Sequence, residues 1–213
     1  MRGGSVMHLE GSSEARAWIV DTWGQQAERQ LECLEELLAK ENARQNLISA
    51  SSLTEIWLRH FADSAQLLRF APGSQGLWLD LGSGAGFPGL VIALLDRAKR
   101  VRLVESRRRR AAWLEAVIGR LGLVNCTVAQ TALERLSSEP AAVISARAFA
   151  SLDQTIVLAA RFSTPDTLWI LPKGSSAAHE VGMLRPRQRQ MFHVEQSFTS
   201  RESGIVIGRG VPA

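Results

Sequence analysis

The chain has 213 residues, of which 46% are hydrophobic and 22% charged, so one globular α/β domain with a helical extension fits its length and composition. The net charge of +4 is a mild excess that suits an anionic partner without requiring one. The first residues lack the apolar core of a signal peptide, and no apolar run approaches the roughly 18 residues of a membrane span. Cys33 and Cys126 have no partners at metal-ligand spacing, so we expect a cytoplasmic protein with reduced thiols, no membrane contact and no metal site.

Helical patterns occupy the first third of the chain. Residues 1–13 are rich in glycine and serine and are predicted to be flexible. A helix is predicted over residues 14–40, because apolar side chains recur three or four positions apart at Ile19, Trp23, Ala27, Leu31, Leu34 and Leu38. A second helix is predicted to start at Ser52, since Ser52-Leu53-Thr54-Glu55 has the form of a capping box. A Pro-Gly pair at 72–73 ends this region, which predicts a helical extension over residues 14–72 and a larger domain over residues 73–213.

The larger domain alternates short apolar runs with helical patterns. Strands are predicted over residues 77–81, 101–105, 124–129, 142–146 and 167–171, and helices over residues 87–97 and 107–121. Residues 191–197 and 204–208 are predicted to form a closing pair of strands. This alternation is typical of an α/β fold, in which a mostly parallel sheet carries helices on both faces.

A glycine-rich loop joins the first predicted strand to the helix that follows it. Four glycines occur within eight residues, in the segment Asp80-Leu81-Gly82-Ser83-Gly84-Ala85-Gly86-Phe87-Pro88-Gly89. Glycines let the backbone turn tightly and approach a ligand closely, and the amides of the following helix favour anionic or polar ligand groups. A plain tight turn is the alternative interpretation, but the position between a strand and a helix favours a nucleotide-type site.

Three residues around this loop indicate which nucleotide it binds. Glu105 ends the second predicted strand, where a carboxylate can accept hydrogen bonds from both hydroxyls of a ribose, as in dinucleotide enzymes and methyltransferases. Phe87 replaces the last glycine of the dinucleotide fingerprint G-x-G-x-x-G. Asp80 would repel a pyrophosphate but attract a cationic sulfonium. The loop therefore favours S-adenosylmethionine over a nicotinamide dinucleotide.

Further motifs on both sides of the loop resemble one known family. The segments that carry the resemblance are Asn46-Leu47, Arg59-His60-Phe61-Ala62-Asp63-Ser64, Asp80 to Gly89, Glu105-Ser106, Ser145-Ala146-Arg147-Ala148-Phe149-Ala150-Ser151-Leu152 and Leu171-Pro172-Lys173-Gly174. Together they resemble the RsmG (GidB) family of bacterial methyltransferases, over roughly residues 34–174. The resemblance implies a Rossmann-like fold, S-adenosylmethionine as cofactor, and methyl transfer to N7 of a guanine in 16S ribosomal RNA.

The resemblance also implies roles for individual residues. Gly82, Gly84 and Phe87 match loop contacts to the cofactor, and Glu105 matches the ribose carboxylate. Leu133 and Glu134 match a pair that flanks the adenine, and Arg147 matches an arginine at the cofactor site. From its place after a buried strand, Arg147 is expected to need an acceptor: the cofactor carboxylate, Asp80 or an RNA phosphate. An ion pair that only holds the loop is the alternative.

The expected substrate needs little acid-base chemistry. Guanine N7 already carries a lone pair, so we expect no general base and assign no catalytic residue. His60 and Asp63 share a helix face, where they either shape the pocket or form a local hydrogen-bonded pair.

The expected partner is ribosomal RNA, the small subunit or its precursor, bound by a monomeric protein. A nicotinamide oxidoreductase and a non-catalytic RNA-binding factor are the alternative functions.

Basic residues predict where RNA binds. The run from Arg107 to Arg110 opens a helix, where each cation costs about 0.3–1 kcal/mol, which favours an anionic partner such as phosphate. We expect Arg107, Arg110 and Lys173 to bind the RNA substrate. A solvated arginine face and a surface turn lysine are the alternatives. Arg185, Arg187 and Arg189 form a second basic cluster with the same ambiguity.

Overall fold

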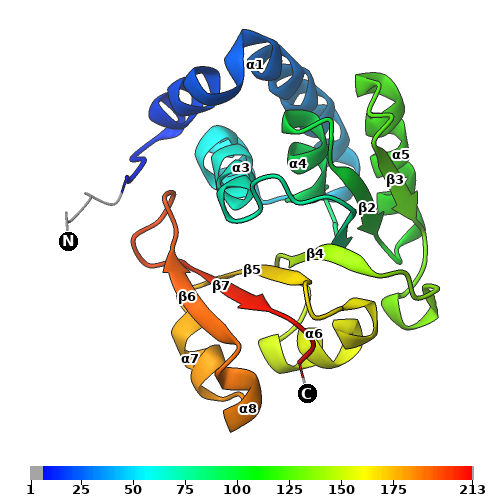
Figure 1. The fold of residues 1–213 in the computed structure, drawn as a ribbon. Helices are drawn as coiled ribbons and strands as arrows, with labels where there is room; N and C mark the ends of the chain where they lie inside the picture. Colours follow the sequence, from blue (N-terminus) through cyan, green and yellow to red (C-terminus); the bar gives the residue numbers. More distant parts are fainter. Residues whose placement is uncertain (1–6, 213) are drawn as a thin grey trace.

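The computed structural model describes residues 7–212, and residues 1–6 of the predicted flexible segment lie outside that range. Its centre is one seven-stranded sheet with the order β3-β2-β1-β4-β5-β7-β6 (Figure 1). The strands are β1 Leu77–Leu81, β2 Arg100–Val104, β3 Cys126–Ala129, β4 Ala141–Ala146, β5 Leu168–Gly174, β6 Phe192–Gln196 and β7 Gly204–Arg209. Strands β1 to β5 are parallel, and β7 is antiparallel to both β5 and β6. The predicted Rossmann-like class and the closing strand pair are therefore confirmed.

Helices cover both faces of the sheet (Figure 1). On one face lie α1 Ser12–Gln45, α2 Ala50–Thr54, the π-helix η1 Trp57–Ala62, α3 Asp63–Ala65, the 3₁₀ helix η2 Gln66–Phe70, α4 Gly89–Leu95 and α5 Arg108–Leu121. On the other lie η3 Leu133–Arg135, α6 Leu152–Ala159, η4 Ala160–Phe162, α7 Ala177–Gly182 and α8 Pro186–Arg189. Because both faces are covered, all five residues of the central strand β1 are buried.

The long first helix differs from its prediction at two points. Gly24 has φ 81° and ψ 171°, which bends α1 between its two halves. The helix also continues beyond residue 40 to Gln45, where Asn46 adopts the left-handed conformation and its N–H bonds the carbonyl of Asn42. The predicted apolar stripe is confirmed, since all its members are buried except Trp23, which is partly buried. No helix among residues 7–212 is long and apolar enough to cross a bilayer.

The second predicted helix is a chain of short helices, and its predicted cap is wrong. Ser49, not Ser52, caps α2: its backbone is extended and its hydroxyl accepts a hydrogen bond from the Ser52 amide at 3.1 Å. Ser52 lies one turn inside the helix and is buried, because the helix starts three residues earlier than the capping-box pattern indicates. After Glu55 the chain continues through the π-helix η1, the single turn α3 and the 3₁₀ helix η2, and the Arg59 carbonyl of η1 accepts a hydrogen bond from Arg147 at the end of β4.

Candidate cofactor and substrate site

The glycine loop leaves the carboxyl end of β1, at the point where the order of the parallel strands reverses between β1 and β4. Gly82 has φ +63°, and a Cβ atom there would lie 2.6 Å from the ring of Phe149. Only glycine satisfies both the backbone conformation and this close approach. The loop thereby leaves an open backbone surface beside Gly84, whose added Cβ would meet its nearest neighbour, Arg110, at 3.7 Å.

Glu105 anchors this loop from the end of β2. One carboxylate oxygen accepts a hydrogen bond from the Gly84 amide at 3.0 Å, and the other accepts one from the Arg107 amide at 2.8 Å. The residue is only 5% exposed, yet it lines a cavity of about 380 Å³. Since a carboxylate offers about four acceptor positions, positions remain for the two hydroxyls of a ribose.

Two adjoining cavities form a groove along the carboxyl ends of β1, β2 and β4. Both are lined by Gly82, Arg110 and Ala148; the larger has about 380 Å³ and the smaller about 150 Å³. The larger one adds Glu105, Arg107, Leu133 and Glu134, and the smaller one adds Gly84, Phe87 and Arg147. The structure thus brings all seven predicted cofactor residues to one groove, together with Arg107 and Arg110. Its size and open backbone fit an S-adenosylmethionine molecule lying across the switch point.

Asp80 lies inside the protein and not in the groove. Its carboxylate is fully buried and accepts hydrogen bonds from the Ser145 hydroxyl at 2.7 Å and the Gly89 amide at 3.3 Å. The indole N–H of Trp78 donates in turn to Ser145 at 2.9 Å. Burial raises the pKa of Asp80 to about 6. The expectation that this carboxylate faces the sulfonium is therefore wrong: on a strand covered on both faces, Asp80 supports the loop from within.

Arg147, at the end of β4, joins the glycine loop to the helical extension. Its guanidinium donates to a carboxylate oxygen of Asp63 at 3.2 Å and to the carbonyl of Arg59 at 3.1 Å. It also meets Nδ1 of His60 at 2.7 Å and lies 5.2 Å from the centre of the Phe87 ring. Of the acceptors expected from the sequence, Asp80 does not bond Arg147; a neighbouring helix, 84 residues away in the sequence, supplies Asp63 instead.

His60 is held neutral in this cluster. Its ring stacks on Phe87 with centroids 4.7 Å apart, and the residue is 8% exposed. Burial, with the nearby charges of Arg147 and Arg59, lowers the pKa of His60 to about 3. Nδ1 therefore accepts from Arg147, while Nε2 has no hydrogen-bond partner among residues 7–212. The side chains of His60 and Asp63 do not bond each other, which excludes the local pair; both contact Arg147.

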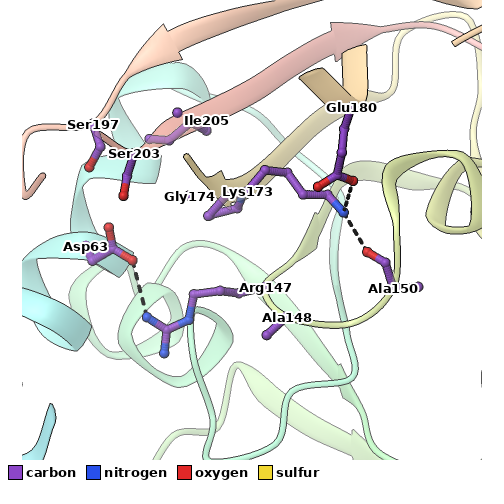
Figure 2. A pocket seen from close by; sticks show the side chains of 12 residues that line it. Asp63, Arg147, Ala148, Ala150, Lys173, Gly174, Glu180, Ser197, Ser203 and Ile205 are labelled. Carbon is purple, nitrogen blue, oxygen red and sulfur yellow. Dashed lines mark hydrogen bonds and ion pairs between the residues drawn. The ribbon is translucent and has the colours of Figure 1, made fainter. Parts of the chain in front are cut away.

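A third cavity, of about 370 Å³, opens on the other side of Arg147 (Figure 2). Its walls come from the ends of β4 and β5 and the start of β7, and it includes Asp63, Arg147, Ala148, Lys173, Glu180 and Gly204. We call it the acceptor cavity. Ala148 lines all three cavities and has φ +53°, an uncommon conformation for a residue other than glycine. Sequence reasoning missed the roles of Ala148 and Phe149, although both belong to the motifs that carry the resemblance.

Lys173 is part of the acceptor cavity, and the turn-lysine alternative is wrong. The strand β5 continues to Gly174, so Lys173 lies within it and its side chain is 9% exposed. Its ammonium donates to the carbonyl of Ala150 and lies 3.1 Å from a carboxylate oxygen of Glu180 (Figure 2). Since an ammonium has three N–H groups, one remains beyond these two acceptors among the described residues.

The two basic clusters lie at opposite edges of the sheet. Arg107 is the N-cap of α5 and, with Arg110, lies at the groove. The second cluster, at residues 185–189, immediately precedes β6, whose first residue pairs with Gly208 of β7. Gly208 pairs with Trp169 near the start of β5, so this cluster is near the amino ends of the parallel strands, away from the site.

Comparisons with known proteins agree with this geometry. The GidB family model, described as rRNA small subunit methyltransferase G, matches residues 27–204. A relative of that name from Erythrobacter litoralis is 52% identical over 197 residues, covering 92% of this chain and 95% of its own. Another from Sphingopyxis alaskensis is 50% identical over 205 residues, covering 95% and 88%. A solved structure of MtNAS in complex with S-adenosylmethionine shares the fold, with a TM-score of 0.53 and 16% identity over 93% of this chain and 77% of that one. These matches confirm the family that the motifs resemble: the chain belongs to the GidB family, rRNA small subunit methyltransferase G.

Proposed function

We propose that this protein transfers a methyl group from S-adenosylmethionine to N7 of a guanine in 16S ribosomal RNA. The observation that carries the proposal is the groove itself, where the seven predicted cofactor residues meet in a chain of this family. Glu105 holds the ribose, Leu133 and Glu134 flank the adenine, and Gly84, Phe87 and Arg147 surround the methionine end. Arg147 is a cation suited to the cofactor's carboxylate.

The reaction asks the protein mainly for positioning. Bound S-adenosylmethionine supplies a methyl group activated by a positive sulfonium. The lone pair of guanine N7 forms the new bond to the methyl carbon as the carbon–sulfur bond breaks, and the positive charge passes to the purine. No proton leaves N7 before attack, so neutral His60 and buried Asp80 are not required as bases. The groove and the acceptor cavity, which share Arg147 and Ala148, bring the two reactants together.

RNA approaches over the start of α5 and the acceptor cavity in this proposal. Arg107 and Arg110 contact phosphates, and Lys173 directs its remaining N–H at the target nucleotide. The helical extension over residues 14–72 supplies His60 and Asp63 to the methyltransferase domain over residues 73–213. The protein acts in the cytoplasm, where the ribosomal RNA, the small subunit or its precursor is available, and it acts as a monomer. Its large exposed apolar side chains, such as Val124, Val157 and Met183, lie on different elements, which supports the monomer.

The test is methyl transfer from labelled S-adenosylmethionine to 16S ribosomal RNA, naked and in small subunits, followed by mapping of the modified nucleotide. We expect label on N7 of a single guanine. Label on another atom or no label contradicts the proposal. Tight binding of S-adenosylhomocysteine without transfer to any of these substrates identifies a non-catalytic binding protein instead.

A further inference from the structure

The acceptor cavity lies on the opposite half of the sheet from the cofactor groove. The groove lies along the ends of β1 and β2, with η3 behind it, and reaches the end of β4, whereas the cavity lies along the ends of β4 and β5 and the start of β7. Arg147 and Ala148, at the end of β4, form the border between the two. A base in this cavity reaches the methyl group only across that border, so its N7 faces Arg147 and Ala148. The rest of the base then faces the inner walls.

Asp63 is a rigidly held carboxylate on these walls (Figure 2). One of its oxygens accepts hydrogen bonds from the hydroxyl of Thr199 at 2.8 Å and from the side-chain amide of Gln66 at 2.9 Å. Gln66 is itself fixed, because its carbonyl oxygen accepts from the Phe198 amide at 2.8 Å. The second oxygen of Asp63 accepts only from Arg147 among the described residues, which leaves it an acceptor position.

The carboxylate is accessible as well as ordered. The side chain of Asp63 is 19% exposed, and it reaches the cavity from the helical extension and not from the sheet. The other carboxylate of the cavity, Glu180, has different partners. Its oxygens accept hydrogen bonds from the Leu152 amide and the Ser176 hydroxyl and form an ion pair with the ammonium of Lys173. Glu180 thus orients a donor, while Asp63 presents an acceptor.

We propose that Asp63 determines specificity for guanine by accepting a hydrogen bond from the N1–H and 2-amino edge of the base in the acceptor cavity. This inference rests on the proposed function. Guanine presents O6 next to N7, followed by N1–H and the 2-amino group, so a donor followed by an acceptor complements it; Lys173 and Asp63 provide that pair. Adenine presents a lone pair at N1 and no 2-amino group, and a carboxylate repels it. The negative charge also favours the base as it becomes cationic during methylation.

The proposal is tested with RNA that carries guanosine, inosine or 2-aminopurine at the nucleotide identified by the mapping experiment. Inosine lacks the 2-amino group, and 2-aminopurine lacks N1–H and O6. For the wild-type protein we expect at least one analogue to lower kcat/KM about tenfold or more. In Asp63→Asn and Asp63→Ala this guanosine preference falls several-fold, because the contact that the analogue removes is already weakened. A structural role alone would lower the activity on all three RNAs by the same factor.

Equilibrium dissociation constants for the same RNAs, measured with S-adenosylhomocysteine present, give a readout independent of turnover and are expected to show the same loss of preference. Asp153→Asn, at an exposed carboxylate of α6 that lines none of the three cavities, is the control, and it is expected to keep the wild-type ratios. Unchanged ratios in both Asp63 variants, or an equal change of the ratios in the Asp153 variant, overturn the inference. A wild-type protein that leaves every RNA unmodified contradicts the proposed function instead.

Discussion

At the scale of single residues, Glu105 combines two tasks, because it anchors the Gly84 amide and faces the larger cavity of the groove. Glu105→Ala removes hydrogen bonds to a charged group, each worth about 1.5–3 kcal/mol, so we expect affinity for S-adenosylmethionine to fall tenfold or more. Isothermal titration calorimetry measures this change. Glu115→Ala, on the exposed side of α5, is the control and is expected to bind as the wild type does. Equal affinities in the two variants would remove Glu105 from the site.

His60 gives a prediction about pH and stability. Its pKa is about 3 in the folded protein and about 6.5 when unfolded, so below pH 6.5 the unfolded chain binds a proton that the folded protein does not. The free energy of unfolding therefore decreases as the pH falls from 6.5 toward 3. The decrease in the free energy of unfolding between pH 7 and pH 5 is expected to be about 2 kcal/mol smaller in His60→Asn than in the wild type, as measured by urea denaturation. Asp80 has a raised pKa and changes the stability in the opposite direction, but it does so equally in the wild type and in His60→Asn. If the free energies of unfolding of the two proteins change in parallel with pH, His60 is not held neutral.

At the scale of elements, two helices contain a glycine in different conformations, and this predicts opposite effects of one substitution. Gly24 bends α1 with φ +81°, whereas Gly119 lies within the regular helix α5 with open space around it. Gly24→Ala is expected to destabilise the protein by about 1–3 kcal/mol through backbone strain. Gly119→Ala is expected to stabilise it by about 0.4–1 kcal/mol. Thermal unfolding measures both, and a stabilising Gly24→Ala would mean that α1 is straight in solution.

The π-helix η1 supplies two of the contacts to Arg147, through the Arg59 carbonyl and His60. π-Helices are rare and frequently mark functional sites, and this one places His60 on Phe87 and leads directly into Asp63. A regular α-helix would rotate these side chains relative to Arg147. The irregular geometry thus connects the helical extension to the end of β4.

At the scale of the whole molecule, the two basic clusters at opposite edges of the sheet give a matched pair of variants. Replacing Arg107, Arg108 and Arg110 with Gln is expected to weaken RNA binding and to flatten its salt dependence by about 0.7–0.9 per lost phosphate contact. Arg109 is kept, because its guanidinium bonds the carbonyl of Arg44. Replacing Arg185, Arg187 and Arg189 with Gln is expected to leave the salt dependence of RNA binding unchanged. Filter-binding titrations at several salt concentrations measure both variants. If the α5 variant keeps the wild-type slope while folded, that helix start is only a solvated surface.

The sequence by itself determines the parallel strands of this protein, the glycine loop and the edge of the sheet at which the groove lies. The apolar runs of β1 to β5, the glycine loop and Glu105 are recognisable because strand period, turn chemistry and motif spacing are local properties. Parallel strands end at one edge of the sheet, so residues that come after different strands can be assigned to one groove from the sequence. The short helices α6, α7 and α8 are not predicted, because a few turns give little periodic signal.

Only the tertiary structure decides which distant residues become partners. Asp63 and Arg147 meet because η1 packs on α1, which packs in turn on α4 and α5, and neither residue alone indicates the other. Burial likewise decides that Asp80 supports the loop from within and that Lys173 faces a cavity. Serines at 49, 51 and 52 each have a side chain suited to a helix cap, and the structure uses Ser49 as the N-cap of α2. These outcomes depend on long-range packing and desolvation, whose free energies exceed the local preferences that a sequence pattern expresses.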